Sequence, residues 1–424
     1  PATVDYIGEY AFYQCTSITS LVMEEGVQGI GTAAFADCSG IRTVSIPSTM
    51  RYINSYAFLD VVPDDLYIYD AEKWCQINFA EEKANLMAVC ARGHVMKADG
   101  TELTNISLWS VYTIPRYAFR NCVNLQSVAF SENLLTIKDH AFTGCTSLQE
   151  LNLPKSLQTI ESYAFTDCTG LKTVTVRDTL NTLGIYVFAN CENLQSITFG
   201  SGLYNLSDFT FDGCTSLQTV VLPSSLTSIG WHAFYGCSSL TSIEIPDGVT
   251  SIGSSAFEGC SSLKRITVPE GVTTLCPYVF SGANYLEEVI LPQSLTIIGS
   301  SAFSGCVSMK SIEIPDSVTE IRSSAFYGCT GLNSVDFPAA LTLISTQAFY
   351  NCPNLKTVVL PASVGEVRNY AFKNATALTS INLENVIAIC EGAFYGCSSL
   401  TEVNYPAFTT VGDWAFAHSG VTYP

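Results

Sequence analysis

The stretch Leu240–Cys260, with the sequence LTSIEIPDGVTSIGSSAFEGC, decides the fold of this chain. Its first residues end in an apolar alternation of period two, which predicts a short strand that buries Ile243 and Ile245. Pro246 has no N–H to offer to a neighbouring strand, so the strand is expected to end there. Gly253 suits a tight turn, and the segment after it is too short for more than about one helical turn.

The same pattern recurs along the chain around an anchor phenylalanine. Successive anchors are 23 residues apart, except at the last two steps, where they are 22 apart, and at one interruption. The seventeen anchors are Phe12, Phe35, Phe58, Phe119, Phe142, Phe165, Phe188, Phe211, Phe234, Phe257, Phe280, Phe303, Phe326, Phe349, Phe372, Phe394 and Phe416. One unit buries too few apolar side chains to offset the conformational entropy lost when its residues become ordered. The units are therefore expected to stack, with each strand pairing to those of its neighbours.

The repeat Leu-x-x-Ile-x-Ile-Pro-x-x-Val-x-x-Ile-Gly-x-x-Ala-Phe-x-x-Cys resembles that of the BspA-like leucine-rich-repeat proteins. The resemblance covers nearly the whole chain. It departs from the commoner leucine-rich repeat, in which an asparagine or cysteine position follows the strand where Pro246 stands here. The predicted fold is one right-handed leucine-rich-repeat solenoid over residues 1–424, with about 17 repeats. A parallel sheet would form one face, and short helical or 3-10 turns the other.

The resemblance also implies a location and a function. Proteins of the BspA-like family are surface or secreted proteins of gut and oral bacteria, with relatives in some protozoan parasites. They have been associated with adhesion to host matrix proteins and to other cells. The resemblance therefore implies a cell-surface or secreted bacterial protein that binds other proteins.

Composition excludes several classes of function. The chain is 47% hydrophobic and 13% charged, but no apolar run approaches the ~18 residues of a transmembrane helix, so no membrane insertion is expected. The formal charge of −19 argues against nucleic-acid partners, because phosphate contacts dominate that binding. Neither end shows a targeting segment and both cut through a repeat, so the chain is expected to be a piece of a longer protein. It is also expected to be a monomer.

One insert interrupts the repeats. Between Phe58 and Phe119 there are 38 more residues than one period requires, and residues 70–102 leave the pattern. Residues 70–77 predict a short helix with an acidic N-cap, and residues 95–103 predict a hairpin that turns at Asp-Gly. A similar insert with its Trp-Cys pair occurs in the BspA-like family. Two interpretations remain open: an excursion that packs on one flank of the solenoid, or a dedicated ligand site.

Most of the seventeen cysteines belong to the repeat. Thirteen stand three residues after an anchor phenylalanine: Cys15, Cys38, Cys122, Cys145, Cys168, Cys191, Cys214, Cys237, Cys260, Cys306, Cys329, Cys352 and Cys397. Other units carry Val61, Ala283, Ala375 or Ser419 there, so the position favours a small side chain, mostly apolar. Stacked Cβ atoms ~4.8 Å apart do not suit a disulfide, which predicts reduced, buried thiols. A disulfide between Cys75 and Cys90 in the insert stays possible.

No pattern for a metal, a cofactor or catalysis is present in the sequence. There is no Cys-x-x-Cys motif, and none of the four histidines has zinc-ligand spacing from a cysteine pair. His140 and His232 occupy the same repeat position, so they belong to a column and not to a unique site. No base is placed beside a nucleophile, and no glycine-rich phosphate loop occurs. The chain is expected to have no catalytic residues, no cofactor and no metal.

The first candidate binding surface is the exposed side of the predicted sheet. It is rich in Ser and Thr, and acidic residues recur on it against a single arginine. Its candidate residues are Glu150, Thr219, Ser242, Glu244, Arg265, Thr267, Glu288, Glu313, Asp336 and Glu402. Solenoids often bind on such a sheet, although Ser and Thr are also ordinary exposed strand residues.

The second candidate surface is the position two residues before the anchor phenylalanine. Eleven of the seventeen units carry an aromatic ring there, histidine included. Its candidate residues are Tyr117, Tyr163, Tyr186, Tyr278 and Tyr370. The rings could pack on one another, or they could form a contact stripe for a protein or a glycan.

The resemblance therefore implies an adhesin that contacts host-matrix or neighbouring-cell proteins through the solenoid surface. Two alternatives remain, a glycan-binding module and a passive spacer that presents another domain. A glycan-binding module would lose its partner after deglycosylation, whereas a spacer would show no saturable binding.

Overall fold

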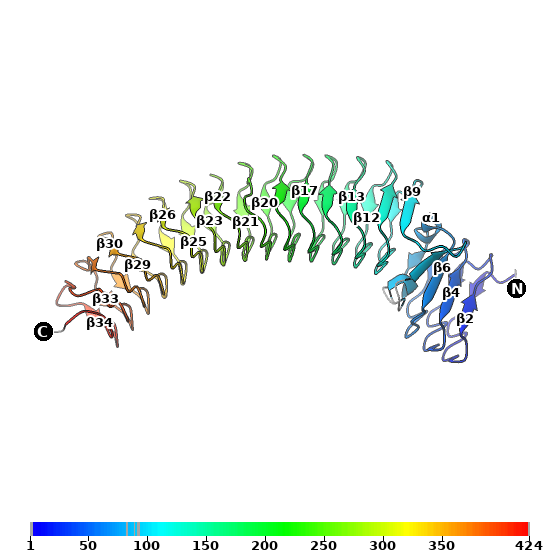
Figure 1. Cartoon of the computed structure of the whole chain (residues 1–424), viewed down its shortest axis with the longest axis horizontal. Coiled ribbons are helices and arrows are strands. Elements are labelled where there is room, and N and C mark those ends of the chain that lie inside the picture. Colours follow the sequence, from blue (N-terminus) through cyan, green and yellow to red (C-terminus); the bar gives the residue numbers. More distant parts are fainter. Residues whose placement is uncertain (1–2, 82–83, 89, 91–93, 423–424) are drawn as a thin grey trace. The chain divides into compact units, whose positions relative to one another are not determined.

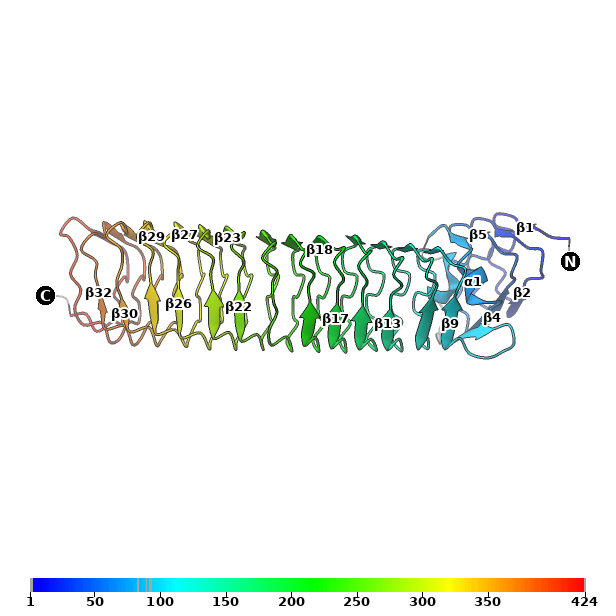
Figure 2. The same cartoon turned by 90° about the horizontal axis from the view of Figure 1, so that it is seen from above.

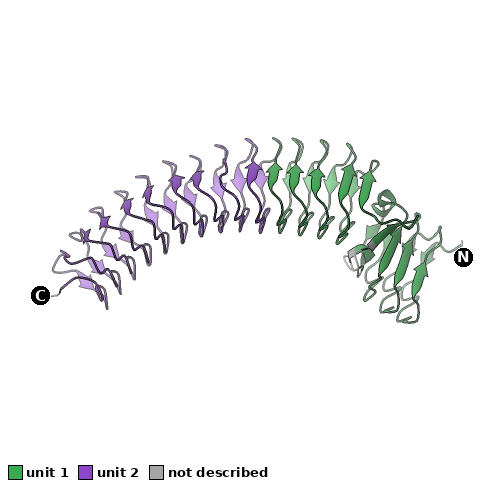
Figure 3. Ribbon diagram, viewed as in Figure 1, with its two compact units in different colours: residues 1–203 green, residues 204–424 purple. Residues whose placement is uncertain are grey.

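A computed structural model describes residues 3–81, 84–88, 90 and 94–422 of the chain. Its residues divide into two compact units, Pro1–Leu203 and Tyr204–Pro424 (Figure 3). Both units consist of stacked parallel coils with almost no helix, so the predicted solenoid of about 17 turns is confirmed (Figure 1). Seen from above, most coils contribute two short strands that lie in separate ladders (Figure 2).

The first ladder, called the face ladder here, contains the strands predicted before each proline. In the first unit its strands are β2 (Ser20–Val22), β4 (Thr43–Ile46), β6 (Asp65–Ile68), β8 (His94–Lys97), β9 (Asn105–Leu108), β11 (Ser127–Phe130), β13 (Glu150–Asn152), β15 (Thr173–Thr175) and β17 (Ser196–Thr198). In the second unit they are β19 (Thr219–Val221), β22 (Arg265–Thr267), β24 (Glu288–Ile290), β26 (Ser311–Glu313), β28 (Ser334–Asp336), β30 (Thr357–Val358) and β32 (Ser380–Ile381).

The second ladder consists of two-residue strands that precede the turn glycine or its equivalent. In the first unit they are β1 (Tyr6–Ile7), β3 (Gly29–Ile30), β5 (Tyr52–Ile53), β7 (Asn78–Phe79), β10 (Thr113–Ile114), β12 (Thr136–Ile137), β14 (Thr159–Ile160) and β16 (Thr182–Leu183). In the second unit they are β18 (Asn205–Leu206), β20 (Ser228–Ile229), β21 (Ser251–Ile252), β23 (Thr274–Leu275), β25 (Ile297–Ile298), β27 (Glu320–Ile321), β29 (Leu343–Ile344), β31 (Glu366–Val367), β33 (Ala388–Ile389) and β34 (Thr410–Val411).

Pairing is parallel in both ladders, and away from the insert its register equals the repeat length. Thr136 pairs with Thr159, for example, while Glu366 pairs with Ala388, one residue closer, in the first of the shorter coils. The face ladder is interrupted in the second unit, where β22 pairs with β24 and β26 with β28. These interruptions leave gaps between neighbouring coils on the exposed face.

One of these gaps lies where a strand was predicted at Ile243 and Ile245. Residues 241–246 lie outside the strands; Ile243 is buried as predicted, whereas Ile245 is only half-buried. One ladder-type bond remains, from Lys264 N to Thr241 O at 3.1 Å. The alternation decides which side chains are buried, whereas ladder bonds also require the right spacing between coils, which the pattern does not encode.

The anchor phenylalanines form the core of each unit. Their rings stack on those of neighbouring coils, with centroids 5.2 Å apart for Phe142 and Phe165 and 5.8 Å apart for Phe257 and Phe280. From Phe35 onward they are almost fully buried. The period of the phenylalanines is therefore the period of one packed column.

The turns between the second ladder and the cysteine are a run of β-turns. Ala256 N, Glu258 N and Cys260 N each donate to the carbonyl oxygen three residues earlier. The amides between them donate to the next coil, as Phe257 N does to Val279 O at 3.0 Å. Alternate amides therefore close the turn and tie the coils together, without a regular helix.

The cysteine column is buried, as predicted. The thiols of most ladder cysteines donate to the carbonyl oxygen of the preceding coil's anchor phenylalanine, as Cys260 Sγ does to Phe234 O at 3.2 Å and Cys329 Sγ to Phe303 O at 3.0 Å. Cys15, in the first coil, is exposed. Among the described residues no disulfide is present; the Cys90 thiol instead donates to Asp64 O at 3.3 Å.

The insert contains the predicted helix and hairpin. Helix α1 (Ala71–Trp74) begins at Asp70, whose side chain accepts the amide of Lys73 at 2.7 Å. A hairpin follows β8, with Lys97 N donating to Thr101 O at 2.7 Å across the turn. A 3-10 turn, η2 (Leu86–Ala88), lies between them. The insert also adds β7 and β8 to the two ladders, beside β5 and β6.

Candidate binding surfaces

All ten candidates on the face ladder are exposed, as the alternation predicts. Most lie in the strands β13, β19, β22, β24, β26 and β28, whereas Ser242, Glu244 and Glu402 lie outside the strands. Glu150 belongs to the first unit, so the structure does not group it with the others, which belong to the second unit.

The gaps in the face ladder form two hollows in the second unit. One, of about 810 Å³, lies between residues 241–245 and β22 and is lined by Ser242, Glu244, Arg265, Thr267 and Glu288. The other, of about 520 Å³, lies between β24 and β26 and is lined by Glu288 and Glu313. The structure therefore brings six of the ten predicted residues together along neighbouring coils.

Three further charged residues line these hollows and were missed from the sequence. Lys264 and Glu287 directly precede the face strands β22 and β24, and Asp316 follows the proline after β26. Lys264 and Glu287 lie one residue before the alternating positions of their strands, whereas Asp316 lies three residues after Glu313. Counting each strand's flanking positions would have found Lys264 and Glu287.

Charge on this face is unevenly distributed. Arg265 is in register with Glu288 on the next strand, which places opposite charges side by side. Glu313 is in register with Asp336, which places two carboxylates on neighbouring strands ~4.8 Å apart. Like charges in such positions destabilise a sheet unless a cation shields them. The second unit therefore presents an acidic patch, defined as Glu244, Glu287, Glu288, Glu313 and Asp336.

The aromatic column lies on the turn side, away from the face ladder. Tyr163 stacks on His140 with centroids 4.7 Å apart and on Tyr186 with centroids 4.9 Å apart, both nearly parallel. Tyr117 stacks on the other side of His140 at 5.4 Å. Because each ring covers the face of its neighbour, these side chains present mainly their edges to a partner.

The remaining column candidates are more isolated. Tyr278 is exposed, and the equivalent positions of the adjacent coils carry Ser255 and Ser301. The side chain of Tyr370 instead contacts Glu391, with its hydroxyl donating to the Glu391 carboxylate. The column is therefore continuous only in part, which argues against one uninterrupted contact stripe.

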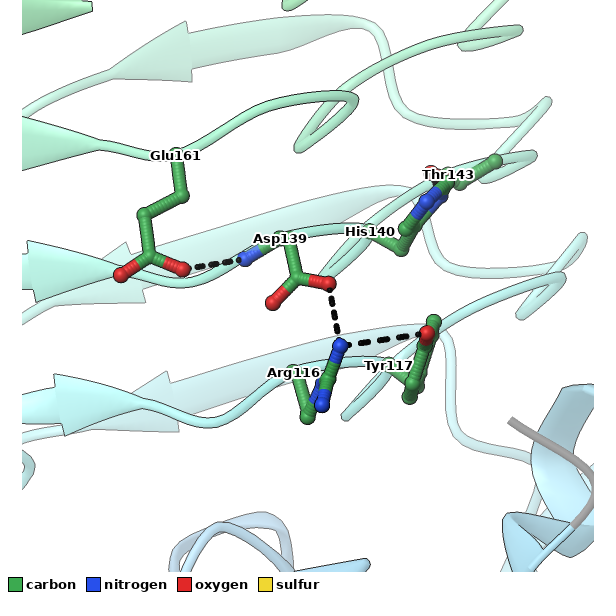
Figure 4. Close-up of polar contacts among 6 residues, drawn as sticks. All are labelled: Arg116, Tyr117, Asp139, His140, Thr143 and Glu161. Atoms are coloured by element: carbon green, nitrogen blue, oxygen red, sulfur yellow. Dashed lines mark hydrogen bonds and ion pairs between the residues drawn. The ribbon is translucent and has the colours of Figure 1, made fainter. Parts of the chain in front are cut away.

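Polar contacts between side chains lie beside the stacked rings of Tyr117 and His140 (Figure 4). Arg116 pairs with Asp139 at 3.0 Å and lies over the ring of Tyr117. Glu161 Oε2 accepts the amide of Asp139 at 3.0 Å, so the two contacts of Asp139 join neighbouring coils. A half-exposed ion pair of this kind contributes little to stability, and its effect here is to position the ring edges.

The chemistry of the buried thiols is that of structural residues. Burial raises the pKa of the Cys352 and Cys397 thiols to about 12, so both stay protonated at neutral pH. Only thiolates act as nucleophiles or metal ligands. Within the described part of the chain no group of three or more His, Cys, Asp or Glu side chains could hold a metal ion. Nor is any helix in that part long and apolar enough to span a membrane.

Comparison with known proteins agrees with the repeat pattern. The family described as the BspA type leucine rich repeat region (6 copies) matches residues 1–63, 99–218, 205–319 and 296–422. No curated protein matches the chain. Among solved structures, a leucine rich cell surface protein from Faecalibacterium prausnitzii A2-165 is 24% identical, with a TM-score of 0.47. That match covers 74% of this chain and 92% of the other. A leucine-rich repeat protein from Bacteroides ovatus is 26% identical over 81% of this chain and 88% of the other, with a TM-score of 0.47.

Proposed function

Because this chain belongs to the family of BspA-type leucine-rich-repeat proteins, we propose that it is a cell-surface or secreted binding protein, an adhesin that contacts a host-matrix or neighbouring-cell protein. Solenoids of this kind offer an extended surface on which many weak contacts can add up. The family relationship supports a role in protein binding. The choice of surface and of partner rests on the charge of the second unit.

The in-register carboxylates of Glu313 and Asp336 carry this proposal. Their mutual repulsion lowers the stability of the free protein, and a basic side chain of a partner would relieve it. Glu288 and Glu244 extend the acidic patch over neighbouring coils, and the two hollows give room for side chains from a partner. The net charge of −19 would also accelerate the approach of a basic protein. The partner we propose is therefore a protein with a basic binding segment.

A binding screen against purified extracellular-matrix proteins, immobilised on a biosensor, tests this function. We expect at least one saturable interaction, weakened by added salt because charges are involved. The double variant Glu313→Lys and Asp336→Lys should weaken it by about tenfold or more, which is ~1.4 kcal/mol. Glu384→Lys with Asp413→Lys makes the same change in net charge at exposed positions off the face ladder and should leave binding nearly unchanged.

Two outcomes would contradict the proposal. Equal loss of affinity in both double variants would mean that only the net charge matters. An absence of saturable binding, with the fold intact, would favour a passive spacer.

A further inference from the structure

A third hollow lies in the first unit, beside the insert. It has a volume of about 440 Å³ and is formed where β6 leads into α1, where β8 ends, and along β9. Strands β8 and β9 belong to different sheets, so the face ladder is open at this point. Its lining residues are Tyr69, Asp70, Ala71, Glu72, Lys97, Leu103, Asn105, Ile106, Ser107 and Trp109. The insert therefore creates a hollow that an uninterrupted solenoid would not have.

Two exposed aromatic side chains border this hollow. Trp109 is 64% exposed and Tyr69 is 54% exposed, whereas the stacked tyrosines of the aromatic column are half-buried. Fully solvated indole rings are costly, because a large apolar surface remains in water. An exposed ring beside a hollow is free to stack on a ligand, in contrast to rings that already cover one another.

The backbone that carries Trp109 is held in place by the insert. Glu72 of α1 accepts two hydrogen bonds from Ser110, from its amide at 2.8 Å and from its hydroxyl at 2.6 Å. These bonds from Ser110 lower the pKa of Glu72, which keeps its carboxyl ionised. The backbone position from which the indole ring projects is therefore defined before any ligand arrives, which reduces the entropic cost of binding.

The rest of the lining supplies both hydrogen-bond donors and hydrogen-bond acceptors. Asp70 caps α1 through one oxygen and, as a carboxylate, has further lone pairs for hydroxyl donors. Asn105 and Ser107 are exposed on β9, and Lys97 ends β8. Lys97 offsets one of the two carboxylates in the lining, Asp70 and Glu72, and Glu72 stays ionised on Ser110. The hollow therefore combines aromatic faces with polar groups and disfavours an acidic sugar.

We propose that this hollow binds a neutral sugar residue of a glycan. A pyranose has a face of C–H groups that packs against the electron-rich face of an indole ring. Its hydroxyl groups need hydrogen-bond partners when they leave water, and Asp70 and Ser107 provide them, together with the second N–H of Asn105, whose amide also contacts Thr104 and Ser127. Trp109 would supply the stacking surface and Tyr69 the second wall. This site lies in the first unit and does not depend on the acidic patch of the second.

Fluorine NMR of the full chain labelled with 5-fluorotryptophan tests this site directly. The chain has four tryptophans, and single substitutions assign the resonances. The probes are methyl glycosides of glucose, galactose and mannose, with sialyllactose as the acidic comparison. We expect at least one neutral glycoside to shift the Trp109 resonance saturably and to leave those of Trp231 and Trp414 unchanged.

Matched variants separate stacking from general surface effects. Saturation-transfer NMR on the glycoside should show binding weakened by about tenfold in Trp109→Ala. The same substitution at Trp231, which is 60% exposed in the second unit, should leave binding intact. Tyr69→Ala provides a second test within the hollow. The proposal is overturned if no neutral glycoside moves the Trp109 resonance, if only the acidic sugar does, or if both tryptophan variants bind equally.

Discussion

At the scale of single residues, each turn places two side chains in the left-handed region of backbone conformation. Two residues after the anchor phenylalanine this position mostly carries glycine, asparagine or aspartate, as in Gly259 and Asn190, which tolerate positive φ. Two residues before the anchor it carries varied residues, most of them aromatic rings or serine, such as Tyr163 with φ 60° and Ser324 with φ 59°. The first position was predictable from residue type. The second was not, because bulky residues rarely adopt such angles and only the stacked coils impose them.

A glycine at the second of these positions should stabilise the protein where no ring is lost. Gly392 already occupies it with φ 58°. Ser324→Gly removes a left-handed penalty of about 1–2 kcal/mol and adds a smaller cost in unfolded-state entropy, so the free energy of unfolding should rise by about 0.5–1 kcal/mol. Urea denaturation measures the difference. Ser324→Ala keeps the penalty and serves as the control, and an equal gain in both variants would refute backbone strain as the cause.

At the scale of elements, the insert takes the place of a coil. In ordinary coils the amide of one turn donates to a carbonyl of the next, as Phe35 N does to Ala57 O at 2.9 Å. Next to the insert, Trp74 Nε1 donates to Ala118 O and Glu81 Oε1 accepts the amide of Tyr56. The helix and the hairpin were predictable from local signals at Asp70 and at the Asp-Gly turn. These side-chain contacts were not, because they join residues 25 to 44 positions apart.

Removing the indole N–H of Trp74 should therefore loosen the coils beside the insert. Trp74→Phe keeps an apolar ring against Phe79 but leaves the buried carbonyl of Ala118 without this donor. An unsatisfied buried acceptor costs about 1–3 kcal/mol, and the first unit should lose stability by that amount. Hydrogen exchange of β10 and β12 would report the loss as faster exchange. The same change at exposed Trp231 should have no effect, and identical exchange in both variants would contradict the assigned role.

At the scale of the whole molecule, the repeat period determines which side chains are buried and which are exposed, more than any single residue does. The anchor phenylalanines, the cysteine column and the exposed face were all predictable, because one register error would turn buried side chains toward solvent. The interruptions of the face ladder near Ile243 and between β24 and β26 were not predictable. They depend on the spacing of neighbouring coils. Units with the same sequence pattern differ in this spacing, so the pattern does not predict it. The two hollows of the second unit arise from those interruptions, whereas the hollow beside Trp109 arises from the insert.

Equivalence of the coils makes a prediction about deletions. Removal of Tyr350–Phe372, one full period, joins Phe349 to Lys373 and leaves every apolar position in register with the next coil. This variant should fold, with a lower urea midpoint and a smaller dependence of unfolding free energy on urea, because one coil less is buried. Removal of Tyr350–Leu360, about half a period, shifts the register and should unfold the coils that follow. Circular dichroism and urea titration distinguish the two, because nearest-neighbour stacking requires that the longer deletion be the milder one.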